Sequence, residues 1–88
     1  MYYVYVLCSS KDKKLYIGRT NNLRRRLAEH NEGISFATAS RRPFVLTYYE
    51  AYAAESDAVH RENSLKLRGQ ARKHLMTRLA ASLRQARS

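Results

Sequence analysis

The amino-acid sequence predicts a small α/β (α+β) fold, in which a three-stranded antiparallel sheet is flanked by helices in the order β-β-α-β-α-α. Two apolar, aromatic segments near the start are joined by a short polar turn, and a third follows Pro43. Other segments space their apolar residues three or four positions apart, as helices do. A small sheet covered by helices buries such faces. With 88 residues, the chain has room for one domain, residues 1–88.

The first two strands are predicted to form a hairpin. Residues 2–8 are aromatic and β-branched, which is typical of a mostly buried strand, and residues 15–18 resume the pattern after the polar turn at 9–14. Alternation along the first strand places Tyr5 on one face and Cys8 on the other. Cys8 is the only cysteine, so no internal disulfide is expected, and its apolar neighbours indicate a small buried residue.

A first helix is predicted after the hairpin. Asn21 or Asn22 can supply its N-cap, because a short polar side chain there accepts a hydrogen bond from a free backbone N–H. The helix runs to about His30 or Asn31. Gly33 then ends it, as glycine readily adopts the left-handed conformation that closes a helix.

The next elements follow from composition and capping signals. Residues 33–42 have the composition of a loop, and residues 44–49 are apolar and aromatic, as in a third strand. Ser56 or Asp57 can cap a second helix over residues 58–67.

The C-terminal segment is predicted to be a third helix from about Ala71, separated by Gly69 from the preceding one. Its apolar residues recur at four-residue steps: Leu75, Leu79 and Leu83. From Arg68 onwards the segment contains no Asp or Glu, so one face of the helix is strongly basic. This face either serves solubility alone or extends a surface that binds nucleic acid.

The charge balance favours a polyanionic partner. The chain has 17 Lys and Arg against 7 Asp and Glu, a formal net charge of +10. Nucleic acid is the expected partner, with DNA ahead of RNA, and a merely basic, well-solvated surface is the alternative. No segment approaches the roughly 20 apolar residues of a membrane span, and the N-terminus lacks the features of a signal peptide. A soluble, cytoplasmic protein without membrane contacts is therefore expected; the sequence leaves the oligomeric state open.

Five polar residues form a plausible set for cleaving a phosphodiester: Tyr5, Tyr16, Arg26, His30 and Glu62. Such a reaction needs neutralisation of charge, a proton acceptor and usually a metal ion. Each residue also has a simpler explanation, because tyrosines in strands usually pack and an arginine run on a helix is usually solvated. Glu62 lies toward the packed side of its helix, where an ion pair with Lys66 or an arginine is as good an explanation as a metal.

The arrangement of these residues resembles the GIY-YIG nuclease superfamily. Tyr3-Val4-Tyr5 is followed, after ten intervening residues, by Tyr16-Ile17-Gly18, like the two triplets that name the superfamily. Arg26 and His30 stand ten and fourteen residues after the second triplet's tyrosine, where the superfamily has its helical Arg and His, and Glu62 matches its metal-binding glutamate. The resemblance covers nearly the whole chain.

The chain resembles in particular the small stand-alone YhbQ-like members, in its length and in the segment Arg41-Arg42-Pro43. It departs from the pattern at two places. Tyr3-Val4 replaces Gly-Ile in the first triplet, although the key phenol at Tyr5 is kept. Ala37-Thr38 stands where small members often have a Tyr-Thr pair.

The resemblance implies a metal-dependent nuclease, an endonuclease that hydrolyses phosphodiester bonds, with DNA as the expected substrate and DNA repair or processing as its setting. One divalent ion, Mg²⁺ or Mn²⁺, would be held by Glu62. Arg26 would neutralise charge on the phosphate. Tyr5 would take a proton from the attacking water and Tyr16 would orient water or phosphate, two roles that could be exchanged. His30 would contact the phosphate or support Tyr5.

Further basic residues are expected to contact nucleic acid: Arg19, Arg24, Arg25, Arg41, Arg42, Lys66, Arg72, Lys73 and Arg78. If a phenol acts directly as the base, the rate should rise from neutral toward alkaline pH. Two other interpretations remain at this level. One is a nucleic-acid-binding module of the same fold with little or no turnover, and the other is an interaction module that docks to an acidic protein.

Overall fold

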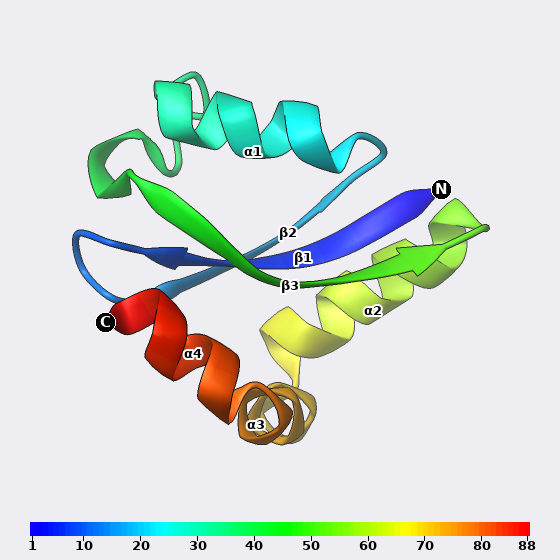
Figure 1. Ribbon diagram of the computed structural model, residues 1–88. Coiled ribbons are helices and arrows are strands. Elements are labelled where there is room, and N and C mark those ends of the chain that lie inside the picture. Colours follow the sequence, from blue (N-terminus) through cyan, green and yellow to red (C-terminus); the bar gives the residue numbers. More distant parts are fainter.

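The computed structural model describes all 88 residues, Met1–Ser88. A three-stranded antiparallel sheet has the strand order β2-β1-β3. Helix α1 lies over one face of this sheet, and α2, α3 and α4 lie on the other (Figure 1). The fold class predicted from the sequence is thereby confirmed. The elements, in chain order, are β1 (Tyr2–Ser9), β2 (Leu15–Thr20), α1 (Leu23–Glu32), a short 3-10 turn η1 (Ala39–Arg41), β3 (Phe44–Tyr52), α2 (Glu55–Leu67), α3 (Gly69–Arg78) and α4 (Ala80–Arg87).

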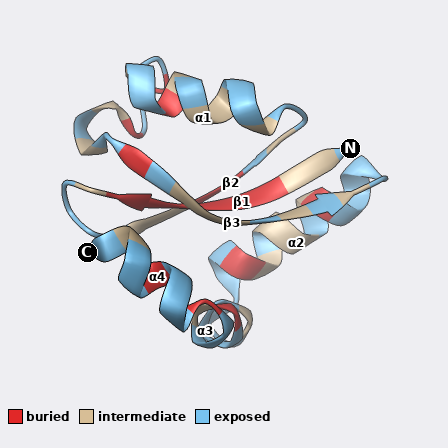
Figure 2. Ribbon diagram, in the orientation of Figure 1, coloured by how far each residue is buried: buried red, intermediate tan, exposed pale blue.

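Strand β1 is the centre of the sheet and is buried on both faces (Figure 2). Val4 and Val6 pack into a core with the leucines of the three C-terminal helices. Tyr5 and Leu7 point to the opposite face and pack with Phe44 beneath α1. This double coverage explains why the N-terminal segment is apolar at every position instead of alternating with polar residues. Cys8 is fully buried, as predicted.

Helix α1 is bounded by the two signals seen in the sequence. The Asn22 side chain accepts a hydrogen bond from the Arg25 backbone N–H, which makes Asn22 the N-cap. At the other end Gly33 has φ 80°, in the left-handed region where a residue with a Cβ is strained. These local bonds set where α1 begins and ends, and so set the positions of Arg26 and His30.

Helix α2 begins earlier than predicted. It starts at Glu55, and its N-cap position, Ala54, makes no side-chain capping bond. Ser56 and Asp57 lie within the first turn, so neither is the cap. The acidic groups of Glu55 and Asp57 instead lie near the positive end of the helix dipole, which favours a start here without a capping side chain.

The predicted C-terminal helix is two helices, broken at Leu79, whose backbone angles of φ −95° and ψ 13° are not helical. The break turns α4 back toward the sheet, where it packs against β3 (Figure 1). A straight helix would diverge from a sheet of this size, whereas the bend keeps all three predicted apolar residues in one core: Leu75, Leu79 and Leu83. None of the helices is both long enough and apolar enough to cross a bilayer.

Candidate active site at the β2 edge of the sheet

The five candidate residues come from four elements and gather near the β2 edge of the sheet. Tyr5 lies on β1, Tyr16 on β2, and Arg26 and His30 on α1. The Tyr16 ring is 6.5 Å from the Tyr5 ring and 5.1 Å from the His30 ring, centroid to centroid. Glu62 reaches the same region from α2, close enough for its charge to act on Tyr5. The structure thus brings together all five residues that the sequence spacing singled out.

Tyr5 is held in a tight slot. Its side chain is 2 % exposed, and its hydroxyl lies 2.8 Å from His30 Nε2. Gly18 is its direct partner across the β1–β2 ladder, and the phenol lies over this glycine. A Cβ at Gly18 would lie 2.4 Å from Tyr5 Oη, closer than real contacts allow. The glycine of the second triplet therefore makes space for the tyrosine of the first, a role that the sequence analysis did not assign.

Burial raises the pKa of Tyr5 to about 12, and the nearby positive charge of Arg26 only partly opposes the effect. The phenol is therefore protonated at neutral pH. It can donate its proton to a neighbouring acceptor, and the acceptor within reach is His30.

His30 is fully buried and makes a hydrogen bond at each ring nitrogen. Nε2 meets the Tyr5 hydroxyl, and Nδ1 lies 2.7 Å from Thr38 Oγ1. Burial lowers the pKa of His30, and the positive charge of Arg26 lowers it further. The imidazole is therefore neutral at pH 7, with one nitrogen free to accept a proton.

Thr38 is a site residue whose role the sequence did not reveal. It lies just before η1, between α1 and β3, and is fully buried. A lone threonine in a polar loop carries no signal of its own. The position stood out only as a departure, because Ala37-Thr38 stands where small GIY-YIG members often have a Tyr-Thr pair. In the structure the Thr38 hydroxyl lies 2.7 Å from His30 Nδ1.

Arg26 is anchored but keeps an exposed face. Its Nη1 is 3.1 Å from Glu29 Oε1 and its Nη2 is 3.3 Å from Ser35 Oγ. About a third of the side chain, 31 %, remains exposed. The guanidinium is thus fixed beside Tyr5 and still able to bind an anion, since a guanidinium has five N–H donors.

Glu62 forms ion pairs with an arginine and with Lys66, which was one of the two explanations for a carboxylate at this position; the other was a metal ion. Arg19 Nε lies 3.2 Å from Oε1, and Lys66 Nζ lies 2.9 Å from Oε2, with the Glu62 side chain 15 % exposed. The Lys66 ammonium also lies 5.9 Å from the centroid of the Tyr16 ring. Each carboxylate oxygen therefore faces a cation.

These residues fit a divalent ion of a particular kind. No group of three or more His, Cys, Asp or Glu side chains is arranged to hold a metal. Glu62 is the only carboxylate among the five candidate residues. Mg²⁺ suits such a site, because it keeps several waters and often takes one carboxylate together with substrate phosphate.

The predicted nucleic-acid contacts divide by position. Arg19, Lys66 and Arg72 border the cluster, since Lys66 and Arg72 share a shallow hollow with Tyr16. Arg41 instead ties the loop before β3 to the hairpin turn, because its Nε lies 2.7 Å from Asp12 Oδ2 and its Nη2 bonds the Leu15 carbonyl. The others are exposed or partly exposed outside the cluster: Arg24 and Arg25 on α1, Arg42 in the loop, and Lys73 and Arg78 on α3.

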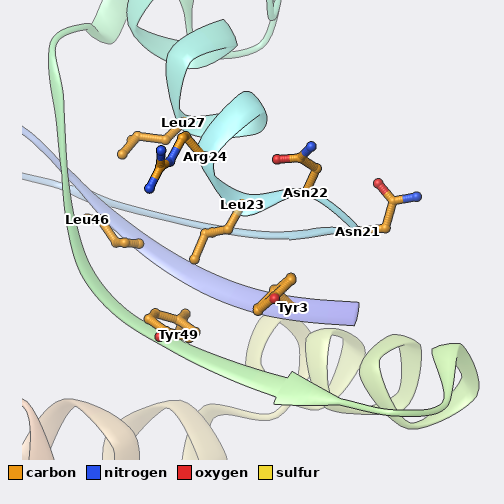
Figure 3. Close-up of a pocket in the computed structure, with 8 residues that line it drawn as sticks. All are labelled: Tyr3, Asn21, Asn22, Leu23, Arg24, Leu27, Leu46 and Tyr49. Atoms are coloured by element: carbon orange, nitrogen blue, oxygen red, sulfur yellow. The ribbon is translucent and has the colours of Figure 1, made fainter. Parts of the chain in front are cut away.

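The largest hollow in the structure is a different place. It has a volume of about 550 Å³ and lies on the β3 side of α1 (Figure 3). Tyr3 and Tyr49 form part of its floor, with their ring centroids 5.8 Å apart. None of the five candidate residues lines it. The rest of its lining is Asn21, Asn22, Leu23, Arg24, Leu27 and Leu46.

Comparison with known families agrees with this geometry. Residues 1–75 match the family described as the GIY-YIG catalytic domain. The sheet, the two triplets on its first two strands, and the Arg and His on α1 all lie within the matched part. The chain belongs to the GIY-YIG family and has its nuclease-type fold.

Relatives within this family include UPF0213 proteins, the YhbQ-like group. One from Syntrophus aciditrophicus is 45 % identical over 74 residues, covering 81 % of this chain and 83 % of the relative. One from Staphylococcus haemolyticus is 42 % identical over 66 residues, covering 74 % and 79 %. The solution NMR structure of a Bacillus halodurans UPF0213 protein is similar with a TM-score of 0.54 and 31 % identity, covering 88 % of this chain and 84 % of that one.

Proposed function

We propose that this protein is a metal-dependent endonuclease that hydrolyses phosphodiester bonds of nucleic acid, with DNA as the substrate and DNA repair or processing as its setting. The observation that carries the proposal is the contact between Tyr5 and His30, beside the anchored Arg26. This contact places a proton acceptor next to a fixed positive charge. Attack of water on a phosphate needs both groups, one to take the proton of the water and one to stabilise the charge on the phosphate.

Arg26 binds the phosphate to be cleaved. Its bonds to Glu29 and Ser35 hold the guanidinium in place before substrate arrives, so little reorganisation is needed when charge builds up on the phosphate oxygens. Arg19 and Lys66 add positive charge at the same edge.

Tyr5 orients the attacking water and accepts its proton. Its hydroxyl lies 2.8 Å from His30 Nε2, which can accept the phenol proton when Nδ1 carries the ring N–H, and its oxygen then keeps a lone pair for water. Tyr16 makes no such bond to His30 and is more exposed, which favours a role in positioning water or phosphate. The contact to His30 thus favours Tyr5 over Tyr16 as the group that accepts the proton.

Glu62 would hold the divalent ion, Mg²⁺ or Mn²⁺. When bound, such an ion supplies Lewis-acid stabilisation of charge on the phosphate and the leaving oxygen. Arg19 and Lys66 hold the carboxylate in a single orientation, and at least one of them has to yield an oxygen for ion binding.

The test is incubation of the purified protein with labelled single- and double-stranded DNA and RNA, with Mg²⁺, Mn²⁺ or a chelator. We expect cleavage that depends on the metal and falls at least about 100-fold in Glu62→Gln, as on loss of a charge-stabilising group. Glu55→Gln is the matched control, because Glu55 also pairs with Arg19 but is exposed and has no second cationic partner. Salt-dependent binding without cleavage would favour the binding module, and cleavage equal in chelator and metal would contradict the metal assignment.

A further inference from the structure

Three buried groups form one continuous line of hydrogen bonds beneath α1: the Tyr5 hydroxyl, the His30 ring and the Thr38 hydroxyl. Tyr5 Oη lies 2.8 Å from His30 Nε2, and His30 Nδ1 lies 2.7 Å from Thr38 Oγ1. The line ends at the Ser35 carbonyl, 3.5 Å from Thr38 Oγ1. A neutral imidazole has one donor and one acceptor nitrogen, so the chain has two possible directions.

The partners at the two ends of this hydrogen-bonded line, Ser35 and Tyr5, decide the direction in which the protons point. If Thr38 donates to the Ser35 carbonyl, its oxygen accepts from His30 Nδ1–H, and Nε2 accepts from the Tyr5 O–H. Every donor then has a partner. In the reverse direction the Tyr5 O–H would find no protein acceptor in a side chain that is 2 % exposed. An unpaired buried donor is costly, so the first direction is favoured.

We infer that Thr38 is a positioning residue for catalysis: it fixes His30 in the tautomer with Nδ1 protonated, so that Nε2 can take the Tyr5 proton when Tyr5 takes one from water. This inference rests on the proposed nuclease function. The proton balance is simple. Water gives a proton to Tyr5 Oη as Tyr5 gives its own to His30 Nε2, so Tyr5 stays neutral and His30 becomes the cation.

The relay removes a difficulty that a direct phenolate base would have. With a pKa of about 12, only about one Tyr5 phenol in 100,000 is ionised at pH 7. In the relay no phenolate accumulates, because the two protons move together. The resulting imidazolium needs acceptors for both N–H groups, and Thr38 supplies the one at Nδ1.

The relay also changes the expected pH dependence. The groups that face His30 are Tyr5, Tyr16 and Thr38 from other elements, with the charges of Arg26 and Glu29 on its own helix. The rate should fall only at acid pH, as His30 becomes protonated, and should be level above that. A direct phenolate base would instead give a rate that climbs through the alkaline range.

The test compares Thr38→Val, which keeps the shape and removes the hydroxyl, with Thr38→Ser, which restores it. In Thr38→Val each tautomer leaves one buried donor unpaired, Nδ1–H in one and the Tyr5 O–H in the other. The Nε2-protonated tautomer should therefore gain population, and cleavage should fall by up to about 100-fold, the lower end of what proton-transfer catalysis contributes. The acid limb should move to lower pH, because the imidazolium is less stabilised. Thr38→Ser should return all three readouts close to wild type.

The tautomer is measured by nitrogen NMR of protein labelled at histidine, with the His30 signals assigned by their absence in His30→Gln. Thr47→Val is the matched control, because Thr47 also bonds a carbonyl, that of Val6, but does not touch His30. It should leave the tautomer and the acid limb unchanged.

The outcomes separate the two levels of the proposal. A wild-type tautomer and wild-type cleavage in folded Thr38→Val would overturn the positioning role. If Thr38→Val does not fold, a wild-type His30 that is Nε2-protonated would overturn it equally. If neither the wild type nor any variant cleaves nucleic acid, yet the His30 tautomer shifts as described, the nuclease function fails while the assignment of Thr38 to His30 stands.

Discussion

Replacing Gly18 by alanine should disable the site from a residue that has no reactive group. The new Cβ would lie 2.4 Å from Tyr5 Oη and 2.5 Å from its Cζ. Ordinary van der Waals contact begins at 3.4 Å, so the phenol has to move by about 1 Å. The Tyr5–His30 bond is 2.8 Å long, and a shift of that size away from His30 takes it out of hydrogen-bonding range.

The expected size of the effect follows from this displacement. Overpacking of a buried site costs about 1–3 kcal/mol of folding free energy. For a domain of this size each kcal/mol lowers Tm by about 4–8 °C. A misplacement of about 1 Å in a catalytic group lowers activity by about 100-fold. The loss of activity should therefore exceed what the fraction of unfolded protein explains at 25 °C.

Thermal unfolding by circular dichroism and cleavage kinetics on the same samples test this expectation. Gly69→Ala is the matched control, because no heavy atom lies within 4 Å of its added Cβ, and both readouts should stay near wild type. In a Tyr5→Leu background, which removes the ring, Gly18→Ala should no longer destabilise the fold. Wild-type Tm and wild-type cleavage in Gly18→Ala would refute the close packing of Tyr5 on Gly18.

Three other perturbations have defined outcomes. Arg26→Ala should lower kcat by about 100-fold or more with the fold intact, whereas Arg25→Ala, whose guanidinium bonds only Asn21, should keep kcat; equal losses in both would argue against a special role of Arg26. Replacing Arg72, Lys73 and Arg78 together by glutamine should weaken binding and lower the salt dependence of the binding constant by up to about three charges, and an unaltered slope would leave these residues with solubility alone. Burial alone would raise the pKa of Glu50, but hydrogen bonds from Arg61, Tyr52 and Tyr48 outweigh it and lower the pKa. Glu50 should therefore stabilise the fold above the ordinary carboxyl pKa and lose this contribution as the pH falls through its folded pKa, so Tm in acid should drop more steeply in wild type than in Glu50→Gln.

Much of the architecture could be predicted from the sequence because it depends on residues close together in the chain. The N-cap at Asn22 and the left-handed Gly33 are decided within a few positions, and the structure has both. The unbroken apolar run of β1 indicated a mostly buried strand, and the structure covers it on both faces. The bend at Leu79 could not be predicted, because Leu75, Leu79 and Leu83 would suit a single helix equally well and only the position of the sheet selects the bend.

The order of residues along the chain was enough to indicate the fold class, the family and the five residues that gather at the β2 edge. The chemical state of these residues follows from tertiary contacts. His30 meets Tyr5 across 25 positions, and Arg19 meets Glu62 across 43. Whether a phenol is an acid or a base, and whether a carboxylate already has cationic partners, depends on burial and on neighbours brought from distant parts of the chain. The spacing of residues in the sequence identifies the candidate side chains, but their protonation states depend on the contacts that form on folding.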